Sequence, residues 1–193
     1  MRLTLRPIEL GDAAAIQRYA SEAELAATCN VPHPYPAGGG LRWAEKSIED
    51  RAARRRFLSA IIAEDAFVGL IGLNAVNFER GTAEVDYWVG RPFWGRGIAT
   101  AAVASATKLA FDELGLVQLS SGCRLANPAS ARVLQKNGFA EIQPVVNDGR
   151  FGTKFLGETI RRFTLLIETW KNQRDPIRHL TARPLHVLQT TRP

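Results

Sequence analysis

Apolar and polar positions along the chain follow two different periods, and each period predicts a different kind of element. Several short segments are almost wholly apolar or alternate apolar with polar residues, which is typical of β-strands. These segments lie at 3–6, 57–63, 67–75, 82–89, 117–123, 139–145 and 159–169. The turn-like residues Glu64, Asp65 and Ala66 separate two of the segments and predict a β-hairpin there.

Four other segments place apolar residues three and four positions apart, as amphipathic helices do. They lie at 13–21, 41–56, 98–114 and 128–137. Asp12 is a suitable cap for the first of these helices, and Gly115 is a suitable stop for the third. Strands and helices are interleaved without a strict βαβ repeat. We therefore predict an α/β fold, with helices on both faces of a central mixed sheet.

Charge is distributed unevenly along the chain. The 193 residues include 25 Lys and Arg against 19 Asp and Glu, and the formal net charge is +6. Segment 171–193 holds five basic residues and one acidic residue, so most of the excess charge lies there and the rest is nearly neutral. We expect a single folded domain over 1–170 and a basic C-terminal tail over 171–193 outside its core.

Several classes of protein do not fit the sequence. No apolar run approaches the roughly 18 residues of a membrane span, and the first residues lack the apolar core of a signal peptide. Cys29 and Cys123 are too few for a disulfide framework and lack the spacing of metal ligands. We expect a soluble cytoplasmic protein with no metal site and no membrane partner.

The turn from Trp94 to Thr100 joins a predicted strand to a predicted helix and carries glycine at two alternate positions. Glycine lets the backbone approach a ligand closely, and the free N–H groups at a helix start attract anions. Arg96 adds a full charge, so the turn predicts a phosphate-bearing ligand. The Walker and dinucleotide-binding patterns do not fit, because Arg96-Gly97 replaces the Walker Lys-Ser/Thr and Thr100 replaces a third glycine. A purely structural turn is the alternative.

Residues 84–100 read Glu-Val-Asp-Tyr-Trp-Val-Gly-Arg-Pro-Phe-Trp-Gly-Arg-Gly-Ile-Ala-Thr, and they resemble the acetyl-CoA motif of the GNAT N-acetyltransferase superfamily. Asn127-Pro128-Ala129-Ser130 and Lys136-Asn137-Gly138-Phe139 look most like its RimJ/RimL branch, the ribosomal-protein-alanine N-acetyltransferases. The resemblance spans about residues 2–169. It implies the GNAT fold, in which two central strands splay apart, and it implies acetyl-CoA as co-substrate.

The resemblance also implies how the co-substrate is held. Backbone groups of Trp88 and Val89 would pair with the pantetheine arm, and Asn127 would contact the same arm. The pyrophosphate would bind the amides of Gly95, Arg96, Gly97, Ile98, Ala99 and Thr100. Pro92 departs from the family, which often carries Gln or Arg there; its missing N–H removes one phosphate contact unless Arg91 compensates.

Acetyl transfer to an amine requires a neutral amine, a polarised thioester carbonyl and protonation of the leaving thiolate. The amine attacks directly, so a nucleophilic Ser, Cys or His is unnecessary. For the base we favour Glu84, with Asp86 second, and alternation places both on one face of their strand. An ion pair of Glu84 with an arginine of the helix at 41–56 is the alternative.

For the acid the resemblance favours Ser130, close to the sulfur. The alternative is that Ser130 only satisfies backbone groups at its helix start, although Asn127 is the better cap. Tyr35 and Trp43 are candidates for lining the acceptor pocket, or else for plain packing. Cys123 is most simply a small apolar strand residue.

We predict an acetyl-CoA-dependent N-acetyltransferase that acts on a primary amine, either a protein N-terminus or a small molecule. Glu22, Glu24 and Glu84 give a slight indication of a basic acceptor. One alternative is a non-catalytic acyl-CoA-binding or regulatory module. Another is a nucleic-acid binder acting through the basic tail, but the nearly neutral body argues against it. Exposed sheet edges near the carboxy-terminal end leave room for a homodimer.

Overall fold

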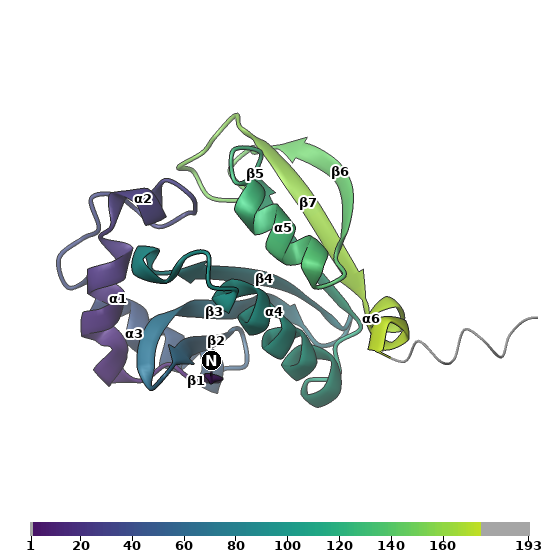
Figure 1. Ribbon diagram of the computed structural model, residues 1–193, viewed down its shortest axis with the longest axis horizontal. Coiled ribbons are helices and arrows are strands. Elements are labelled where there is room, and N and C mark those ends of the chain that lie inside the picture. Colours follow the sequence, from purple (N-terminus) through teal and green to yellow (C-terminus); the bar gives the residue numbers. More distant parts are fainter. Residues whose placement is uncertain (1, 175–193) are drawn as a thin grey trace, which may run out of the picture.

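The computed structural model describes residues 2–174, and these contain a seven-stranded sheet. Across the sheet the strands follow the order β1 (Leu3–Pro7), β2 (Phe57–Ala63), β3 (Ala66–Asn77), β4 (Thr82–Val89), β5 (Gln118–Arg124), β7 (Thr159–Leu166) and β6 (Ala140–Val146). All neighbouring pairs are antiparallel except β4 and β5, which run parallel. The predicted mixed sheet is confirmed (Figure 1).

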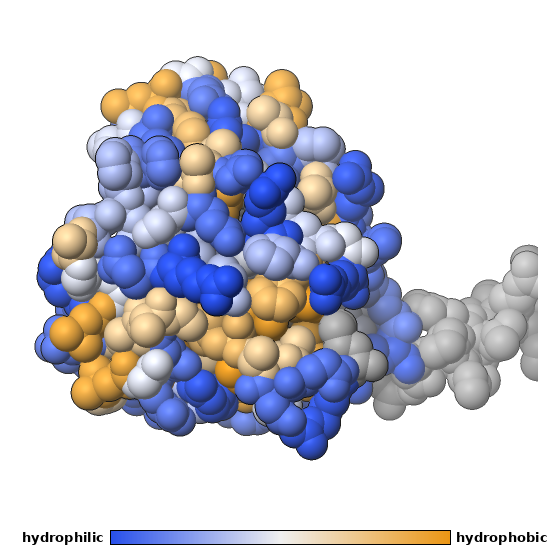
Figure 2. Space-filling model, turned by 60° about the vertical axis from the view of Figure 1, so that its left-hand side comes forward, coloured by the Kyte–Doolittle hydropathy of each residue, from blue (hydrophilic) through white to orange (hydrophobic). Residues whose placement is uncertain are grey.

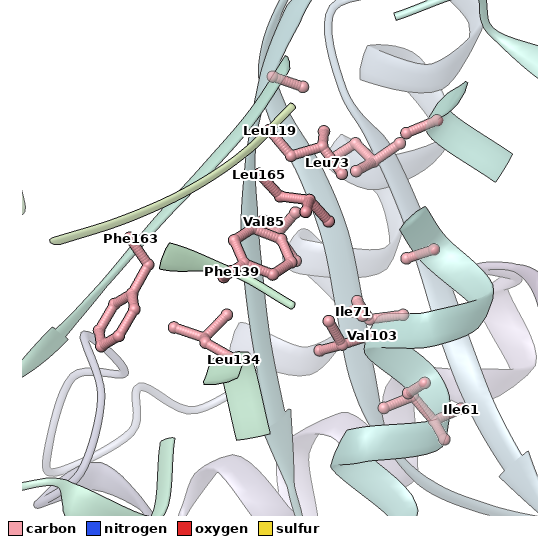
Figure 3. Close-up of a cluster of buried hydrophobic side chains, with 14 of the residues drawn as sticks. Ile61, Ile71, Leu73, Val85, Val103, Leu119, Leu134, Phe139, Phe163 and Leu165 are labelled. Atoms are coloured by element: carbon pink, nitrogen blue, oxygen red, sulfur yellow. The ribbon is translucent and has the colours of Figure 1, made fainter. Parts of the chain in front are cut away.

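Helices cover both faces of this sheet, as the sequence predicted. They are α1 (Ala13–Ala20), α2 (Ala23–Ala26), α3 (Gly39–Ala52), α4 (Ile98–Lys108), α5 (Pro128–Lys136) and α6 (Ile167–Arg174). One buried cluster joins the sheet to α4 and α5 and includes Val103 and Leu134. A second cluster joins the other face to α1 and α3 through Ile16 and Ala44. Figure 3 shows part of the first cluster, where Phe139 lies between Leu134 and the side chains of the central strands.

Local conformation explains the β2–β3 hairpin. Glu64 and Asp65 both have positive φ, 48° and 67°, which matches the right-handed twist of the strands that they connect. Further along β3, Gly69 lies against the backbone carbonyl of Trp88 so closely that a side chain would collide with it. Glycine in this strand therefore serves a close approach of two backbones.

The central pair of parallel strands separates soon after it forms. Only Thr82 to Glu84 of β4 pair with β5, opposite Gln118 to Ser120, and the strands diverge beyond that point. Figure 1 shows the result as two wings, β1–β4 with α1, α3 and α4 in one and β5–β7 with α5 in the other. On the side turned forward in Figure 2, apolar side chains form separate patches between polar ones.

The last predicted strand is too long. β7 ends at Leu166, and the chain then forms α6 over Ile167–Arg174 instead of continuing to residue 169. Phe163 and Leu165 alternate into the core along β7, and after the strand Trp170 turns back into the core and meets Phe111, with ring centroids 5.3 Å apart. The expected tail therefore begins with four residues that complete a helix, and residues 175–193 lie outside the described part.

Two smaller differences concern helices. α4 ends at Lys108 and passes into a π-helical turn over Leu109–Glu113, so the predicted helix at 98–114 is not α-helical throughout. No pattern in the sequence predicted α2, a single turn of four residues. None of the helices within residues 2–174 is long and apolar enough to cross a membrane.

Candidate active site

The separation of β4 and β5 opens a cleft of about 620 Å³. Its walls also include the starts of α4 and α5, the residues that follow α2, and the loop between β6 and β7. The structure brings every predicted catalytic and cofactor residue to this cleft. These are Glu84, Asp86, Trp88, Val89, Gly95, Arg96, Gly97, Ile98, Ala99, Thr100, Asn127 and Ser130.

Strand β4 presents different side chains to the two faces of the sheet. Its pairing with β3 is regular from Glu84 to Val89, so simple alternation holds along this stretch. Val85 and Val89 belong to the core beneath α4 and α5. Trp88 packs on the other face of the sheet, the side of α1 and α3, and Glu84 and Asp86 project from that same face. The cleft can therefore be approached from two opposite sides of the same strand.

The glycine turn has the conformation that its anion-binding function requires. Gly95 and Gly97 both have φ of +75°, and the space where a side chain would stand is open at each. No acceptor within residues 2–174 bonds the amides from Gly95 to Thr100, so they stay available for a ligand. Open space, free amides and the positive end of the α4 dipole fit a pyrophosphate.

Cations add to the charge of this end of the cleft. Arg96 lines it from the turn, and Arg132 and Lys136 line it from α5. Arg91 does not replace the phosphate contact that Pro92 lacks. Its guanidinium lies 3.3 Å from Glu24 and it is not part of the cleft wall.

The backbone groups of Trp88 and those of its neighbours in β4 point toward different strands. The Trp88 carbonyl faces Gly69 of β3, so its main-chain groups belong to the sheet. The Val85 carbonyl accepts from the Ser121 hydroxyl of β5 at 2.7 Å, which shows that odd-numbered residues turn their backbone toward the gap. Tyr87 and Val89 thus offer backbone groups to the cleft. The Val89 carbonyl already accepts a hydrogen bond from the Trp94 indole.

Ser130 lies at the start of α5 and is held by two partners. Its amide donates to the Asn127 side chain at 3.1 Å, so Asn127 is the helix cap, as predicted. Its hydroxyl lies 2.8 Å from the hydroxyl of Tyr87, which also lies 3.1 Å from the Ser130 carbonyl. Burial raises the pKa of Tyr87 well above its ordinary range, so this phenol stays protonated at neutral pH.

Asp86 is the better positioned of the two carboxylates. It accepts a hydrogen bond from the Asn74 side chain at 2.9 Å, and Arg56 donates to the other end of that amide at 2.6 Å. Water reaches Asp86 from the cleft, but protein surrounds it on most sides. This crowding, followed by the like charge of Glu84, raises the pKa of Asp86 above its usual range.

Glu84 is exposed at the point where β4 and β5 still pair. The alternative ion pair with an arginine after α3 is absent from residues 2–174. Arg55 and Arg56 instead surround the buried Asp50, at 2.8 Å and 3.5 Å. Glu84 therefore faces the cleft with its charge uncompensated by a direct ion pair in the described chain.

A bridge between two distant segments closes one end of the cleft. The Lys154 ammonium, in the loop between β6 and β7, donates to the carbonyls of Ala26 and Val31. Arg124 of β5 forms a paired contact with Glu158 at 2.7 and 2.9 Å. These contacts hold the aromatic loop residues Phe151 and Phe155 over the cleft, beside Cys29 and Asn30.

Some candidates for the acceptor pocket do not reach the cleft. Tyr35 packs on Gly39 at the start of α3, and Trp43 lies under the Arg56 guanidinium, 5.2 Å from it. Neither residue lines the cleft. Glu22 accepts from the amide of Arg91, so it does not form an acidic acceptor groove as expected.

Comparison with known proteins identifies the family of this chain. Residues 2–140 match the family described as Acetyltransferase (GNAT) domain. The chain belongs to this family of acetyltransferases. It is an N-acetyltransferase with acetyl-CoA as co-substrate. It is 30% identical to the "Uncharacterized N-acetyltransferase p20" of Bacillus licheniformis over 141 residues, 72% of this chain and 79% of that protein.

Two further similarities are with enzymes of different stated acceptors. The spermidine N(1)-acetyltransferase of Vibrio cholerae is 24% identical, over 90% of this GNAT chain and 98% of its own length. The structure of RimL, the ribosomal L7/L12 alpha-N-protein acetyltransferase, in complex with coenzyme A has a TM-score of 0.77. It is 18% identical, over 86% of this chain and 95% of that chain. This last similarity supports the fold alone.

Sequence reasoning missed several residues of this GNAT site. Tyr87 was read only as part of a motif, although it is the partner of Ser130. Arg132 also lines the cleft from the start of α5, but its spacing of two from Ser130 gave no signal for it, because residues two apart on a helix do not share a face. Phe151, Phe155 and Arg162 come from segments whose position depends on the tertiary fold, and no local pattern identified them.

Proposed function

We propose that the chain transfers the acetyl group from acetyl-CoA directly to a primary amine in the cleft between β4 and β5. One observation carries the proposal. Two hydroxyls, those of Tyr87 and Ser130, and two carboxylates, those of Glu84 and Asp86, line the same cleft from opposite faces of β4. An amine and a thioester that meet in the gap would have an acid on one side and a base on the other.

In this proposal acetyl-CoA binds at the α4 side of the cleft. The free amides from Gly95 to Thr100 would bind the pyrophosphate, with Arg96, Arg132 and Lys136 offsetting its charge. The pantetheine arm would then run along the edge of β4 that β5 leaves unpaired. Backbone groups of Tyr87 and Val89 face this edge, so we assign to Tyr87 the role that the family resemblance gave to Trp88.

Asp86 is the residue we assign as base, with Glu84 as its electrostatic neighbour. A base is most effective when its pKa approaches the working pH, and the pKa of Asp86 is raised in that direction. The hydrogen bond from Asn74 fixes one carboxylate oxygen. The remaining oxygen is left to accept a proton from the amine, directly or through a water molecule.

The bond changes balance with these groups and solvent. The amine nitrogen forms a bond to the carbonyl carbon, its surplus proton passes to Asp86, and the carbon–sulfur bond breaks. The electron pair leaves with the sulfur as a thiolate, which receives a hydrogen bond from Ser130; a proton from solvent then gives the free thiol, and Asp86 returns its proton to solvent. The Tyr87 hydroxyl lies within reach of both the carbonyl and the hydroxyl of Ser130, and when its single hydrogen turns to the serine hydroxyl oxygen, the serine hydrogen is free to point at the sulfur.

The acceptor class is a primary amine, on a small molecule or at a protein N-terminus. The names of the relatives include both kinds, spermidine for one and the α-amine of a ribosomal protein for the other. The same geometry at the reacting atoms serves either kind, because only the neutral amine takes part in the bond exchange.

A direct test measures thiol release from acetyl-CoA with a panel of amines and identifies the N-acetylated product by mass spectrometry. We expect Ser130→Ala to lower kcat by about 100-fold, in the range of lost acid–base assistance, with the Kd of acetyl-CoA unchanged. Ser105→Ala on the exposed face of α4 is the matched control. A Ser130→Ala enzyme with the turnover of the wild type would remove Ser130 from the mechanism.

A further inference from the structure

The half of the cleft lined by β5, β7 and the β6–β7 loop, here called the acceptor half, contains an arginine that has no carboxylate partner within the described residues. Three arginines line this half, namely Arg124, Arg150 and Arg162. Arg124 is paired with Glu158, and Arg150 with Asp148 at 2.6 Å. No carboxylate within residues 2–174 pairs with Arg162, although Arg161 beside it is paired with Glu141.

Strand pairing places Arg162 on the same face as the two carboxylates. Glu84 pairs with Ser120, and Gly122, two residues further along β5, pairs with Arg162 of β7. Paired residues share a face of the sheet, and so do residues two apart. Phe163, the next residue, is fully buried in the opposite core. The Arg162 side chain therefore projects into the acceptor side of the cleft.

The surroundings of Arg162 form a pocket between β4 and β7. The Arg162 guanidinium lies 5.8 Å from the ring centre of Phe151, which covers it from the β6–β7 loop. Between Arg162 and β4 stands Gly122, where an added side chain would lie 3.1 Å from Ile160 and 3.7 Å from Phe151. Glycine in mid-strand is unfavourable unless something must approach the backbone. Gly122, which has no side chain, leaves the space between Arg162 and Asp86 open.

We infer that Arg162 binds an anionic group of the acceptor, so that the acceptor is an amine that also carries a carboxylate. This rests on the function proposed above and narrows its acceptor class. The amine would lie at Asp86 and the carboxylate of the acceptor at Arg162. These residues stand on β4 and β7, separated by two strand spacings of about 4.8 Å each. The splay of β4 and β5 increases this distance, and the two side chains reach toward each other and reduce it. Guanidinium and carboxylate form paired, charge-assisted hydrogen bonds.

This arrangement distinguishes the site from one built for a polyamine. A polyamine carries positive charge at both ends, and a half-buried guanidinium without a partner would repel one of them. A free amino acid and a peptide that begins with an acidic residue both combine an amine with a nearby carboxylate. Arg162 recognises the carboxylate that both acceptors carry, and the experiment below distinguishes a free amino acid from a peptide.

The experiment compares matched acceptors at saturating acetyl-CoA. The panel pairs amino acids with their α-amides, and short peptides that begin with Asp or Glu with the same peptides beginning with Asn or Gln. Spermidine is added as an acceptor without a carboxylate. We expect kcat/KM to be about 10- to 100-fold higher for the carboxylate member of at least one pair, as charged hydrogen bonds allow. Arg162→Gln should abolish that preference, and Arg162→Lys should restore part of it.

The controls separate this inference from the proposed function. Arg161→Gln, on the opposite face of β7, should keep the preference, and the Kd of acetyl-CoA should be the same in all variants. Acetyl transfer without preference for any carboxylate member would overturn the inference and leave the proposed function standing. Acetyl-CoA binding without transfer to any amine would overturn both. A weaker Kd of acetyl-CoA in Arg162→Gln would place Arg162 with the co-substrate and also overturn the inference.

Discussion

The two ends of the cleft are built in different ways. The α4 end consists of free backbone amides from six consecutive residues, 95–100, and its ligand contacts depend on φ angles at Gly95 and Gly97. The acceptor end consists of side chains from β4, β5, β7, the segment after α2 and the β6–β7 loop. One end is therefore a local structure, and the other exists only when these five segments come together.

The GNAT fold thus provides the phosphate-binding end of the cleft, whereas the side chains of the individual chain determine which acceptor the other end binds. A phosphate needs donors and positive potential, which a helix start supplies whatever the side chains are. An acceptor is recognised by the position and charge of particular side chains, such as Asp86 and Arg162. Changes at the first end should affect acetyl-CoA binding, and changes at the second should affect turnover and the choice of amine.

The largest effect is expected at the α4 end. Gly97→Glu should weaken acetyl-CoA binding by about 1,000-fold or more, because the new side chain adds backbone strain at φ of +75° and a negative charge beside the pyrophosphate. Calorimetric titration measures this. Gly115→Glu is the matched control, because Gly115 has φ of +69° and open space but lies outside the cleft wall. Equal affinities for both variants would contradict the assignment of the turn.

The next effect concerns the acceptor end. Asp86→Asn should lower kcat by about 100-fold, the lower end of what a lost general base costs, while the Kd of acetyl-CoA stays the same. Steady-state kinetics combined with titration separates the two quantities. Asp112→Asn, at the exposed end of the helical segment that includes α4, is the control and should behave like the wild type. Turnover that survives in Asp86→Asn would transfer the role of base to Glu84.

A moderate effect is expected where the two distant segments are bridged. Lys154→Met removes the ammonium that donates to carbonyls of Ala26 and Val31. We expect the KM of the amine to rise by about tenfold, since the lost charged hydrogen bonds loosen the loop over the acceptor end. The Kd of acetyl-CoA should not change. A parallel loss of acetyl-CoA affinity would show that the two ends of the cleft are not independent.

The smallest effect is a shift in pH dependence. A base must be ionised to act, so the rate falls as the pH drops through the raised pKa of Asp86. Glu84→Gln removes a like charge that helps to raise this pKa. We therefore expect the acidic limb of the kcat profile to move to lower pH while the rate at its plateau stays close to that of the wild type. A limb that does not move would mean that Asp86 does not govern it.

The local features of the fold followed from residue patterns. The glycine turn, the hairpin at Glu64 and Asp65, the Asn127 cap and most strands are set by neighbours in sequence, so short-range chemistry identifies them. The last strand was predicted too long, because the apolar pattern of β7 continues past Leu166 in the sequence but not in the fold. The contact of Trp170 with Phe111 there joins residues that are far apart along the chain. The homodimer remains a prediction.

The sequence by itself determined the family, the co-substrate end and the residue types available for chemistry. The reason is that a phosphate-binding helix start is continuous in sequence and its glycines are required by backbone geometry. Only the tertiary structure decided that Tyr87 meets Ser130, that Asn74 holds Asp86, and that Tyr35 and Trp43 stay away from the cleft. It also left Arg162 without a carboxylate partner among residues 2–174, on the same face as Glu84 and Asp86, because strand order and register set which side chains share a face.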